Sequence, residues 1–548
     1  MRIKIISLAA AALLASGMNA WSCTSLIATP GATDKGSSLV TYAADAHVLY
    51  GALAHKAAAD HAPGSMRAVN DWDTGEFHGY IPEVAHTYET IGNMNEHGLT
   101  IAESTWGGRP ELAGTGTIDY GSLIYITLER ARTAREAVKI MTDLVNDYGY
   151  ASEGESFSIA DPNEVWILEL IGKGKADKGA VWVARRVPDG YISGHANHSR
   201  IHKFPLNDHE TLYSPDVISF AREQGYFDGA DEDFDFSRTY AVTDVLALRG
   251  CDARVWSYFR RFTPEGQMDA YVPWILKGEG EVMPLWVKPD RKLTANDLKW
   301  MMRDHFEGTE LDMTKDVGAG PYGVPYRWRP LTYVVDGNEY THERAIATQQ
   351  TGFSFVADMN DKRPEAATGI LWFGVDDANT CAYVPVFSSV KAVPHSLDEN
   401  TADLLTLDWG SMFWVNNYVA NQAYNRYNQM IPDIRRVQES LEKEMEASAD
   451  NAVATVASMT EQEASDYLTA LTDYWAEKTT ADYHKLGDYL LVKYLDGNIK
   501  KEKDGVFERN PQGVPVQPDY GGYNERYFRS IVESDGPHFY VGPAPAEK

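Results

Sequence analysis

The first 23 residues constrain this chain most, because they have the parts of a secretory signal peptide followed by a cysteine. Arg2 and Lys4 supply a positive start, and residues 5–15 are almost wholly apolar. Small residues stand at the third and first positions before Cys23, as a signal peptidase requires. We therefore expect residues 1–22 to be a signal peptide and the mature protein to be exported, to the periplasm or the extracellular space. Cleavage after Ala20 is the alternative, and would call for a second cut.

Cleavage before Cys23 would leave this residue with both a thiol and a free α-amino group. The reference pKa is about 7.7–8.0 for the amine and about 8.5 for the thiol, so a proton moves between them at little cost. Cys23 can then supply both a nucleophile and its general base. Two other interpretations are open: a lipid anchor on Cys23, as in a bacterial lipoprotein, and a buried structural cysteine. Ala20 and the bulky Trp21 weaken the lipoprotein interpretation, because a leucine is typical at the third position before a lipidated cysteine.

The negative net charge of the chain limits the kinds of partner that it can bind. Its 548 residues carry a formal net charge of −29, with ordinary fractions of hydrophobic (44%) and charged (24%) residues for a globular protein. Nucleic-acid binding needs concentrated Lys and Arg, which this composition does not favour. No apolar run after residue 22 reaches the length of about 20 residues that spans a bilayer. We expect no nucleic-acid partner and no membrane span, and the sequence leaves a homo-oligomer open.

Three cysteines are too few for a disulfide scaffold. If Cys23 is catalytic, Cys251 and Cys381 form an even pair that could cross-link in an oxidising compartment, and two free thiols are the alternative. The scattered spacing of His47, His97 and His195 matches no zinc-site pattern, and an α-amine base makes a catalytic histidine unnecessary. We therefore expect no metal and no other cofactor.

The spacing of the apolar residues predicts an α+β fold. Helical spacing over 120–145 predicts two helices with a break near Thr133, and the chain from 412 to about 497 is mainly helical. The segment 207–350 is rich in loops and receives no assignment. We divide the chain into the signal peptide (1–22), a core (23–400) and a mainly helical C-terminal region packed on it (401–548). Strands are expected at 24–28, 38–42, 180–186, 369–373 and 382–387. Strand pairs are expected over 93–102, around a turn at 95–98, and over 156–170, around a turn at 161–163.

Seven short motifs follow one another along most of the chain. Each is unspecific alone, but in this order they resemble the N-terminal-nucleophile cysteine hydrolases, and most closely the secreted dipeptidase family (dipeptidase A, related to secernins). Penicillin V acylases and bile salt hydrolases are more distant relatives. The motifs are Cys23-Thr24-Ser25 and the segments 41–45, 92–99, 119–123, 153–157, 193–197 and 253–257.

The resemblance implies a four-layer αββα sandwich in which the N-terminal residue lies at the end of a central strand. It also implies that the Cys23 thiolate attacks a peptide carbonyl, that the α-amine moves the proton, and that water hydrolyses the resulting thioester. An exported dipeptidase acting on short peptides is the leading hypothesis. The alternatives are an amidase of the penicillin V acylase or bile salt hydrolase type and, in a different class, a non-enzymatic lipoprotein anchored through Cys23.

The resemblance also implies roles for three further residues. Asn197 is the candidate for the oxyanion hole, because its amide can donate without a change of charge. Asp45 matches a carboxylate close to the nucleophile, where it would hold the α-ammonium of Cys23 or the amino group of a substrate. Arg254 matches an active-site arginine and would pair with the C-terminal carboxylate of a peptide. For each, a structural role stays open: a turn cap for Asn197, a loop cap for Asp45 and an ion pair for Arg254.

Two positions depart from the pattern of the wider superfamily. Thr41-Tyr42-Ala43 stands where that superfamily usually has Gly-Arg-Asn, so Tyr42 takes the place of an arginine without its charge. Thr105 lies near the position at which bile salt hydrolases have an oxyanion-hole Asn, and it can donate through its hydroxyl or its backbone amide. We therefore add Tyr42 and Thr105 as candidates for contacts with the substrate or the oxyanion.

Overall fold

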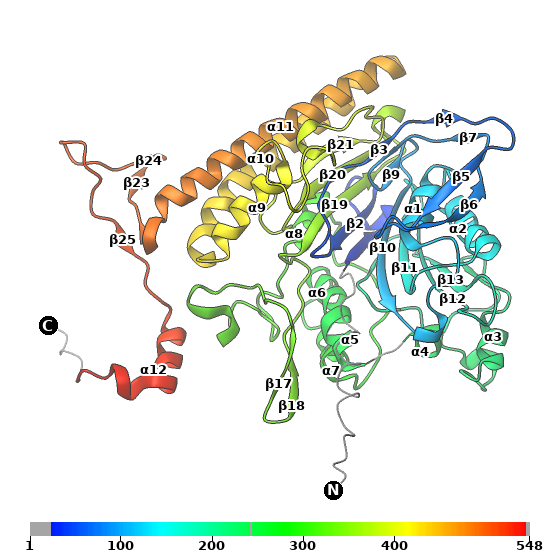
Figure 1. Cartoon of the computed structure of the whole chain (residues 1–548), viewed down its shortest axis with the longest axis horizontal. Coiled ribbons are helices and arrows are strands. Elements are labelled where there is room, and N and C mark those ends of the chain that lie inside the picture. The colour runs from blue at the N-terminus through cyan, green and yellow to red at the C-terminus, as the bar shows by residue number, and fades with distance from the viewer. Residues whose placement is uncertain (1–22, 242–243, 544–548) are drawn as a thin grey trace, which may run out of the picture.

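The computed structural model describes residues 23–241 and 244–543 (Figure 1). Its secondary structure is mixed, with two large sheets and helices packed on both. This confirms the α+β class. The expected signal peptide lies outside the described residues, so export stays a prediction. No helix in the described part of the chain is long and apolar enough to cross a bilayer.

The first large sheet has seven antiparallel strands and contains the segment that follows Cys23. Its strands β1, β2, β20 and β21 are buried along their whole length, which is expected for a sheet covered on both faces. In spatial order the strands are β16 (Trp286–Val287), β14 (Ile192–His195), β1 (Ser25–Ala28), β2 (Ser38–Asp45), β19 (Thr351–Met359), β20 (Gly369–Val375) and β21 (Val384–Phe387).

The second large sheet has eight antiparallel strands, and its central strands β10 and β11 contact β2 of the first sheet. Strand β10 also contacts β1, so the two sheets meet beside the start of the described chain. In spatial order the strands are β15 (Thr211–Tyr213), β13 (Ala180–Arg186), β12 (Val165–Gly172), β11 (Gly154–Ala160), β10 (Thr100–Gly107), β9 (Met94–Asn95), β8 (Thr90–Ile91) and β3 (His55–Lys56).

In the described chain, three helices pack on the eight-stranded sheet: the short α3 (Val217–Glu223) contacts β13, and two longer helices form the main layer. The longer two are α1 (Tyr120–Leu128), which contacts β10, and α2 (Ala134–Tyr148), which contacts β11, β12 and β13. Thr133 is the N-cap of α2, and its hydroxyl accepts a hydrogen bond from the backbone N–H of Glu136. The predicted break near Thr133 is therefore a helix start. A compact apolar cluster that includes Leu123, Val138 and Phe157 fills the space between these two longer helices and the sheet.

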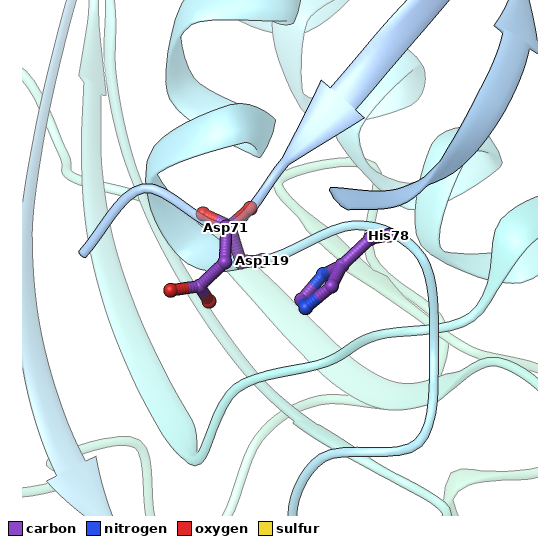
Figure 2. A group of neighbouring side chains, drawn as sticks. All are labelled: Asp71, His78 and Asp119. Atoms are coloured by element: carbon purple, nitrogen blue, oxygen red, sulfur yellow. The ribbon is translucent and has the colours of Figure 1, made fainter. Parts of the chain in front are cut away.

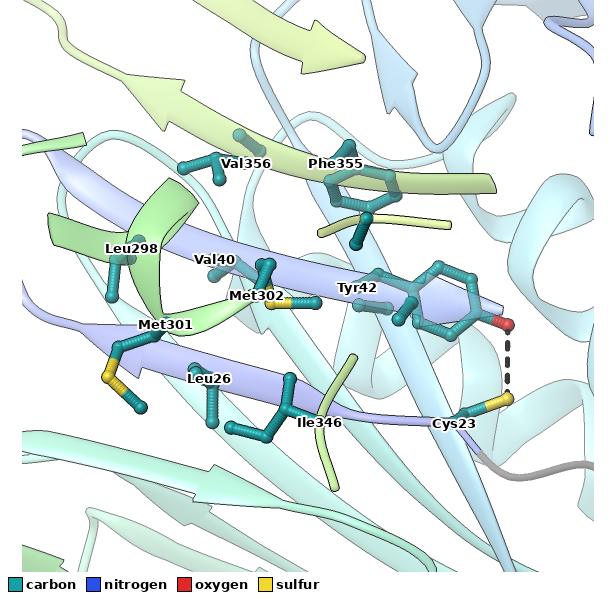
Figure 3. Close-up of a cluster of buried hydrophobic side chains, with 14 of the residues drawn as sticks. Cys23, Leu26, Val40, Tyr42, Leu298, Met301, Met302, Ile346, Phe355 and Val356 are labelled. Carbon is teal, nitrogen blue, oxygen red and sulfur yellow. Dashed lines mark hydrogen bonds between the residues drawn. The ribbon is translucent and has the colours of Figure 1, made fainter. Parts of the chain in front are cut away.

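Other helices pack on the seven-stranded sheet. Helix α6 (Ala253–Phe262) contacts β14, and α8 (Ala295–Met301) contacts β19. The C-terminal helices α9 (Met412–Ala423), α10 (Tyr427–Val456) and α11 (Glu461–Lys493) contact β20 and β21. Their buried side chains belong to the same apolar cluster as β1 and β2, and Figure 3 shows part of it, with Cys23 among its members.

The remaining elements are short and lie largely in the segment without a prediction or at the C-terminus. The helices are α4 (Phe236–Tyr240), α5 (Val245–Ala247), α7 (Val272–Lys277) and α12 (Glu525–Phe539). The strands form the pairs β4 (Ala59–Asp60) with β7 (His86–Thr87), β5 (Met66–Asn70) with β6 (Phe77–Pro82), β17 (Thr332–Val335) with β18 (Asn338–Thr341), β22 (Asn498–Ile499) with β25 (Asp519–Tyr520), and β23 (Glu502–Lys503) with β24 (Val506–Phe507).

The three cysteines are free thiols. Cys251 and Cys381 do not form a disulfide in this structure, so of the two alternatives for this pair the free thiols are the correct one.

Candidate active site

Cys23 lies immediately before β1 at the junction of the two sheets. Its neighbour Thr24 exchanges two backbone hydrogen bonds with Ala43 of β2, which holds the start of the described chain against that strand. The Cys23 side chain is fully buried, and its thiol donates to Oε1 of Glu103 over 3.2 Å. The hydroxyl of Tyr42 is 3.7 Å from Sγ (Figure 3). Cys23 is therefore held by a strand pair and faces an acid and a phenol.

Glu103 of β10 and Glu155 of β11 form a buried pair of carboxyl groups beside this thiol. Glu103 also accepts a hydrogen bond from the Tyr42 hydroxyl, and Glu155 accepts one from the hydroxyl of Thr105 over 3.0 Å. Burial raises the pKa of both carboxyl groups, and the pKa of Glu155 is raised further by the negative charge of Glu103. Glu103 Oε2 and Glu155 Oε1 meet no hydrogen-bond donor among the described residues, which fits two facing carboxyl groups that share one proton.

Asp45 ends β2 and is fully buried. Its carboxylate accepts hydrogen bonds from Arg344 and from the hydroxyl of Thr351, each over 2.6 Å. Burial raises the pKa of Asp45, while the Arg344 guanidinium acts in the opposite direction. The negative charge of Asp45 is thus already paired within the protein.

Arg254, on α6, links the backbone of Cys23 to Asn197. Its Nη1 donates to the Cys23 carbonyl oxygen and to the Thr24 hydroxyl, each over 2.8 Å, and its Nη2 donates to Asn197 Oδ1 over 2.9 Å. The Asn197 amide donates to the Thr105 carbonyl oxygen over 2.7 Å. Asn197 has a φ of 55°, in the left-handed region that Asn tolerates better than most residues. These contacts join α6, the end of β14, β10 and the start of β1.

The thiol itself is disfavoured as a thiolate. Burial raises the pKa of Cys23 well above its usual value, and the negative charges of Glu103 and Asp45 raise it further. Burial lowers the pKa of Arg254 to about 10, and the nearby Arg344 lowers it too, so Arg254 is still a cation at neutral pH. An attack by Sγ therefore requires a base that removes its proton.

The six residues that sequence reasoning put at the site all lie in this one network. Residues that it missed are Glu103, Glu155 and Arg344. A signal for the first two was present, because each is a lone acid inside an otherwise apolar or small-residue strand that the structure buries completely. Arg344 gave no signal, since its segment received no assignment. The six predicted residues are Cys23, Tyr42, Asp45, Thr105, Asn197 and Arg254.

A recess with aromatic walls opens beside Tyr42. The rings of Trp72 and Tyr125 are stacked in it, with centroids 4.4 Å apart and planes at 26°. This recess is next to the thiol and offers apolar surface for the side chain of a ligand. Its other aromatic walls are Tyr120 and Phe353.

Of the three histidines considered in the sequence, His195 lies in the core. Its two ring nitrogens form hydrogen bonds with the hydroxyls of Ser104 over 2.6 Å and Ser158 over 2.8 Å. Burial lowers the pKa of His195 to about 3. It is a neutral, fully engaged core residue. Among the described residues, a group that could offer three ligand atoms within 4.8 Å of one another is Asp71, His78 and Asp119, on the β5–β6 hairpin and at the N-cap of α1 (Figure 2).

Comparisons with known proteins show which family this chain resembles. The model of peptidase family C69 matches residues 22–440. A probable dipeptidase of Latilactobacillus sakei is 24% identical over 429 residues, which cover 73% of this chain and 83% of the relative. A probable dipeptidase of Salmonella dublin is 25% identical over 57% of this chain and 69% of the relative. A probable dipeptidase A of Streptococcus pyogenes serotype M18 (strain MGAS8232) is 25% identical over 76% of this chain and 84% of the relative.

The family match covers well over half of the chain and begins next to Cys23. The chain is therefore a peptide hydrolase that belongs to peptidase family C69.

Proposed function

We propose that this peptide hydrolase is an exported dipeptidase whose mature N-terminal residue, Cys23, is the nucleophile. The observation that carries the proposal is the placement of Cys23: its thiol is buried beside an acid and a phenol, and Arg254 fixes its carbonyl oxygen over 2.8 Å. The relatives named as dipeptidases support the substrate class. Two sheets that meet at Cys23, with helices packed on each, are the arrangement that an αββα sandwich of the N-terminal-nucleophile type requires.

The proposed reaction uses the α-amine that cleavage before Cys23 would free. This amine takes the proton from Sγ, and Sγ forms a bond to the carbonyl carbon of the peptide. The C–N bond of the peptide then breaks, and the amine returns the proton to the leaving nitrogen. Water, activated by the same amine, hydrolyses the thioester and releases the second product with a free thiol.

The network around Cys23 supports positioning roles for two of the predicted residues. Each donor group of Arg254 (Nε, Nη1 and Nη2) contacts a protein oxygen, including the Gly250 carbonyl over 2.9 Å. This favours Arg254 as the residue that orients Cys23 over a role as the partner of a substrate carboxylate. Asn197, held by Arg254 and by the Thr105 carbonyl, is the proposed donor to the oxyanion.

An amidase of the penicillin V acylase or bile salt hydrolase type is the second candidate within the same chemistry. Its substrates carry an uncharged acyl group next to the attacked carbonyl. The buried carboxyl groups of Glu103 and Glu155 beside the thiol are an unfavourable environment for such a group. The site therefore favours a peptide.

The test combines the mass of the mature protein with a substrate panel. A mature protein that begins at Cys23 with a free amine is expected, and Cys23→Ala is expected to reduce hydrolysis of dipeptides to background while thermal unfolding is unchanged. Cys381→Ala is the matched control, because it removes a buried thiol near Ala378, Arg303 and Glu442, outside the network, and should keep the activity. Activity in Cys23→Ala, a lipid on Cys23, or turnover of acylated amides alone would overturn the proposal.

A further inference from the structure

Glu103 and Glu155 form a buried pair of facing carboxyl groups beside the nucleophile, with no cation among the described residues paired to either. Within the described chain, neither makes an ion pair with Lys, Arg or His, and their hydrogen-bond partners are the Cys23 thiol and the hydroxyls of Tyr42 and Thr105. Three other buried acids are paired with cations: Asp45 with Arg344, Glu129 with Lys56 and Arg67, and Glu442 with Arg303. Buried acids without an ion pair in the described chain, such as Glu169 and Asp377, lie away from the Cys23 thiol and accept hydrogen bonds from backbone N–H groups or hydroxyls. A buried anion without a cation costs several kcal/mol. A buried carboxyl pair that lacks a cation and lies beside a nucleophile is suited to binding a cationic ligand.

The position of Glu103 relative to Sγ identifies which part of a peptide would supply the cation. The carbonyl carbon under attack must come to about 3–3.5 Å from Sγ. The α-nitrogen of the same residue is about 2.5 Å from that carbon, as the bond lengths of the backbone dictate. Glu103 Oε1 is 3.2 Å from Sγ. These distances allow the α-nitrogen of the residue whose carbonyl is attacked to reach Glu103 when that residue is turned toward β10.

We propose that the Glu103–Glu155 carboxyl pair binds the free α-ammonium of the substrate, so that the enzyme selects peptides with an unblocked N-terminus and cleaves after their first residue. This inference rests on the proposed function, since it takes Cys23 as the nucleophile. One proton shared within the pair leaves a single negative charge, which matches a single ammonium group. The α-amine of Cys23 is not this cation, because it must be neutral to accept the thiol proton.

The aromatic recess supports the same orientation of the substrate. Tyr42 donates to Glu103 and also forms a wall of the recess, together with Trp72 and Tyr125. A residue whose ammonium contacts Glu103 therefore has its side chain next to this apolar surface. The recess has a cavity volume of only about 20 Å³, so it offers an apolar surface against which the first side chain packs, and apolar first residues are the expected preference.

The decisive measurement is the ratio of kcat/KM for a dipeptide to kcat/KM for its N-acetylated form. In the wild-type enzyme the ratio is expected to exceed about 100, because acetylation leaves the buried carboxyl pair without a cation. In Glu103→Gln the ratio is expected to fall at least about ten-fold, since a charge-assisted hydrogen bond becomes a neutral one. Glu155→Gln should lower the ratio as well, and serves if Glu103→Gln fails to fold.

Glu129→Gln is the matched control. It replaces an equally buried carboxyl group that is already paired with Lys56 and Arg67, so the ratio should remain that of the wild type. Equal turnover of free and N-acetylated dipeptides by the wild type would overturn the inference. So would a parallel loss of both activities in Glu103→Gln, because the pair would then act on Cys23 and not on the substrate. Dipeptide hydrolysis that survives Cys23→Ala would instead overturn the proposed function, so the two failures are distinguishable.

Discussion

A buried thiol beside two acids is a poor nucleophile until a base removes its proton. Burial and the charges of Glu103 and Asp45 raise the pKa of Cys23, so the resting group is a neutral thiol. This is the opposite of a cysteine activated by a neighbouring histidine cation. In the described chain His195 is close to Ser104 and Ser158, not to Sγ. The environment of Cys23 therefore suits a base that arrives with maturation, such as the residue's own amine.

Arg254→Lys is expected to lower kcat/KM about 100-fold, mainly through kcat. Lysine cannot donate to the Cys23 carbonyl, the Thr24 hydroxyl and Asn197 at the same time. The nucleophile is then displaced, and a displacement of about 1 Å lowers the rate about 100-fold. The unfolding free energy should fall by about 1–3 kcal/mol, because buried acceptors lose their donor. Steady-state kinetics and thermal unfolding measure both effects.

Arg260→Lys is the control for this variant, because Arg260 lies on the same helix and is half-buried at its surface end. A change in KM alone in Arg254→Lys would contradict the positioning role and restore a direct contact with the substrate.

Glu155→Gln is expected to change how stability depends on pH. Burial raises the pKa of Glu155 in the folded protein, whereas the unfolded chain has a value of about 4.3. The folded state thus binds more protons than the unfolded state above about pH 4.3, so wild-type stability is lost as pH rises from there through the folded pKa. Glutamine does not ionise and still bridges Thr105 and Glu103. The difference in Tm between wild type and variant should therefore fall as pH rises from 4 to 8.

Glu442→Gln is a control for which we expect the opposite dependence of stability on pH. Although burial acts against it, the Arg303 guanidinium holds the pKa of Glu442 below its usual value. Its contribution to stability is present above about pH 4.3 and is lost as pH falls below that value. If the Tm of the wild type and the Tm of Glu155→Gln change in parallel from pH 4 to 8, the pKa of Glu155 is not raised in the folded protein.

Sequence reasoning found the half of the site that lies in recognisable motifs. Cys23, Asp45, Asn197 and Arg254 each stand in a short segment whose order along the chain carries information. A lone acid in an apolar strand makes Glu103 unusual, but its contact with Cys23, 80 residues away, arises only because β10 packs across β1 and β2. A contact between two sheets depends on the packing of both and leaves no local pattern.

At the level of single elements, the β5–β6 hairpin and α1 shape the aromatic recess together. Trp72, in the turn of the hairpin, lies directly over Gly121 of α1 and stacks on Tyr125 one turn further along the helix. A Cβ at Gly121 would come 2.3 Å from Trp72 Cγ, so only glycine permits this close approach. The recess therefore depends on one glycine and one hairpin.

Gly121→Ala is expected to raise KM for dipeptides with a large apolar first residue while kcat changes less. Alanine improves the helix by about 1 kcal/mol, but displacement of the indole costs about 1–3 kcal/mol, so Tm should fall slightly or stay unchanged. Kinetics with small and large first residues, together with tryptophan fluorescence, measure the effect. In a Trp72→Gly background the same substitution should stabilise the protein, because the indole and the Cβ of residue 72, which an added Cβ would approach to 2.3 and 2.5 Å, are both absent. If Gly121→Ala destabilises in that background too, the indole is not the cause.

Elements with strong local signals were predictable, and those without were not. Thr133 marks the start of α2 because its side chain caps the helix, and α11 begins with a capping box at Thr460. The short helices between 207 and 350 have one or two turns each, which is too short for a periodic pattern to emerge. Their position depends on contacts with the sheets, so the sequence alone left this segment unassigned.

At the scale of the molecule, the helices after residue 401 divide into two groups. Side chains of α9, α10 and α11 are buried in the same apolar cluster as the seven-stranded sheet, with Met412, Met445 and Leu468 among them. Helix α12 has no buried residue among those described, and Figure 1 shows it apart from the sheets. The single boundary expected at residue 400 therefore separates parts that share a core, whereas the chain after about residue 509 contributes little to that core.

A chain truncated after Arg509 should keep its activity. The removed part is joined to the rest by the short β22–β25 strand pair and by the exposed Lys501–Asp519 ion pair. Asn524 also donates to the Pro321 carbonyl over 2.7 Å, and the ring of Tyr523 contacts Tyr322. Losses at such exposed contacts are usually within about 0.5 kcal/mol each. We expect kcat/KM within about two-fold of the full chain and a nearly unchanged Tm, because no group of the Cys23 network lies beyond this point.

Truncation after residue 400 is the matched comparison, and it should abolish folding. It uncovers β20 and β21, whose buried residues pack on α9–α11, and exposed apolar strands favour aggregation. Soluble yield and thermal unfolding of the two truncated chains measure the difference. If the longer truncated chain folds but loses dipeptide hydrolysis, the C-terminal segment acts on the substrate or on assembly, and the network around Cys23 is not sufficient for turnover.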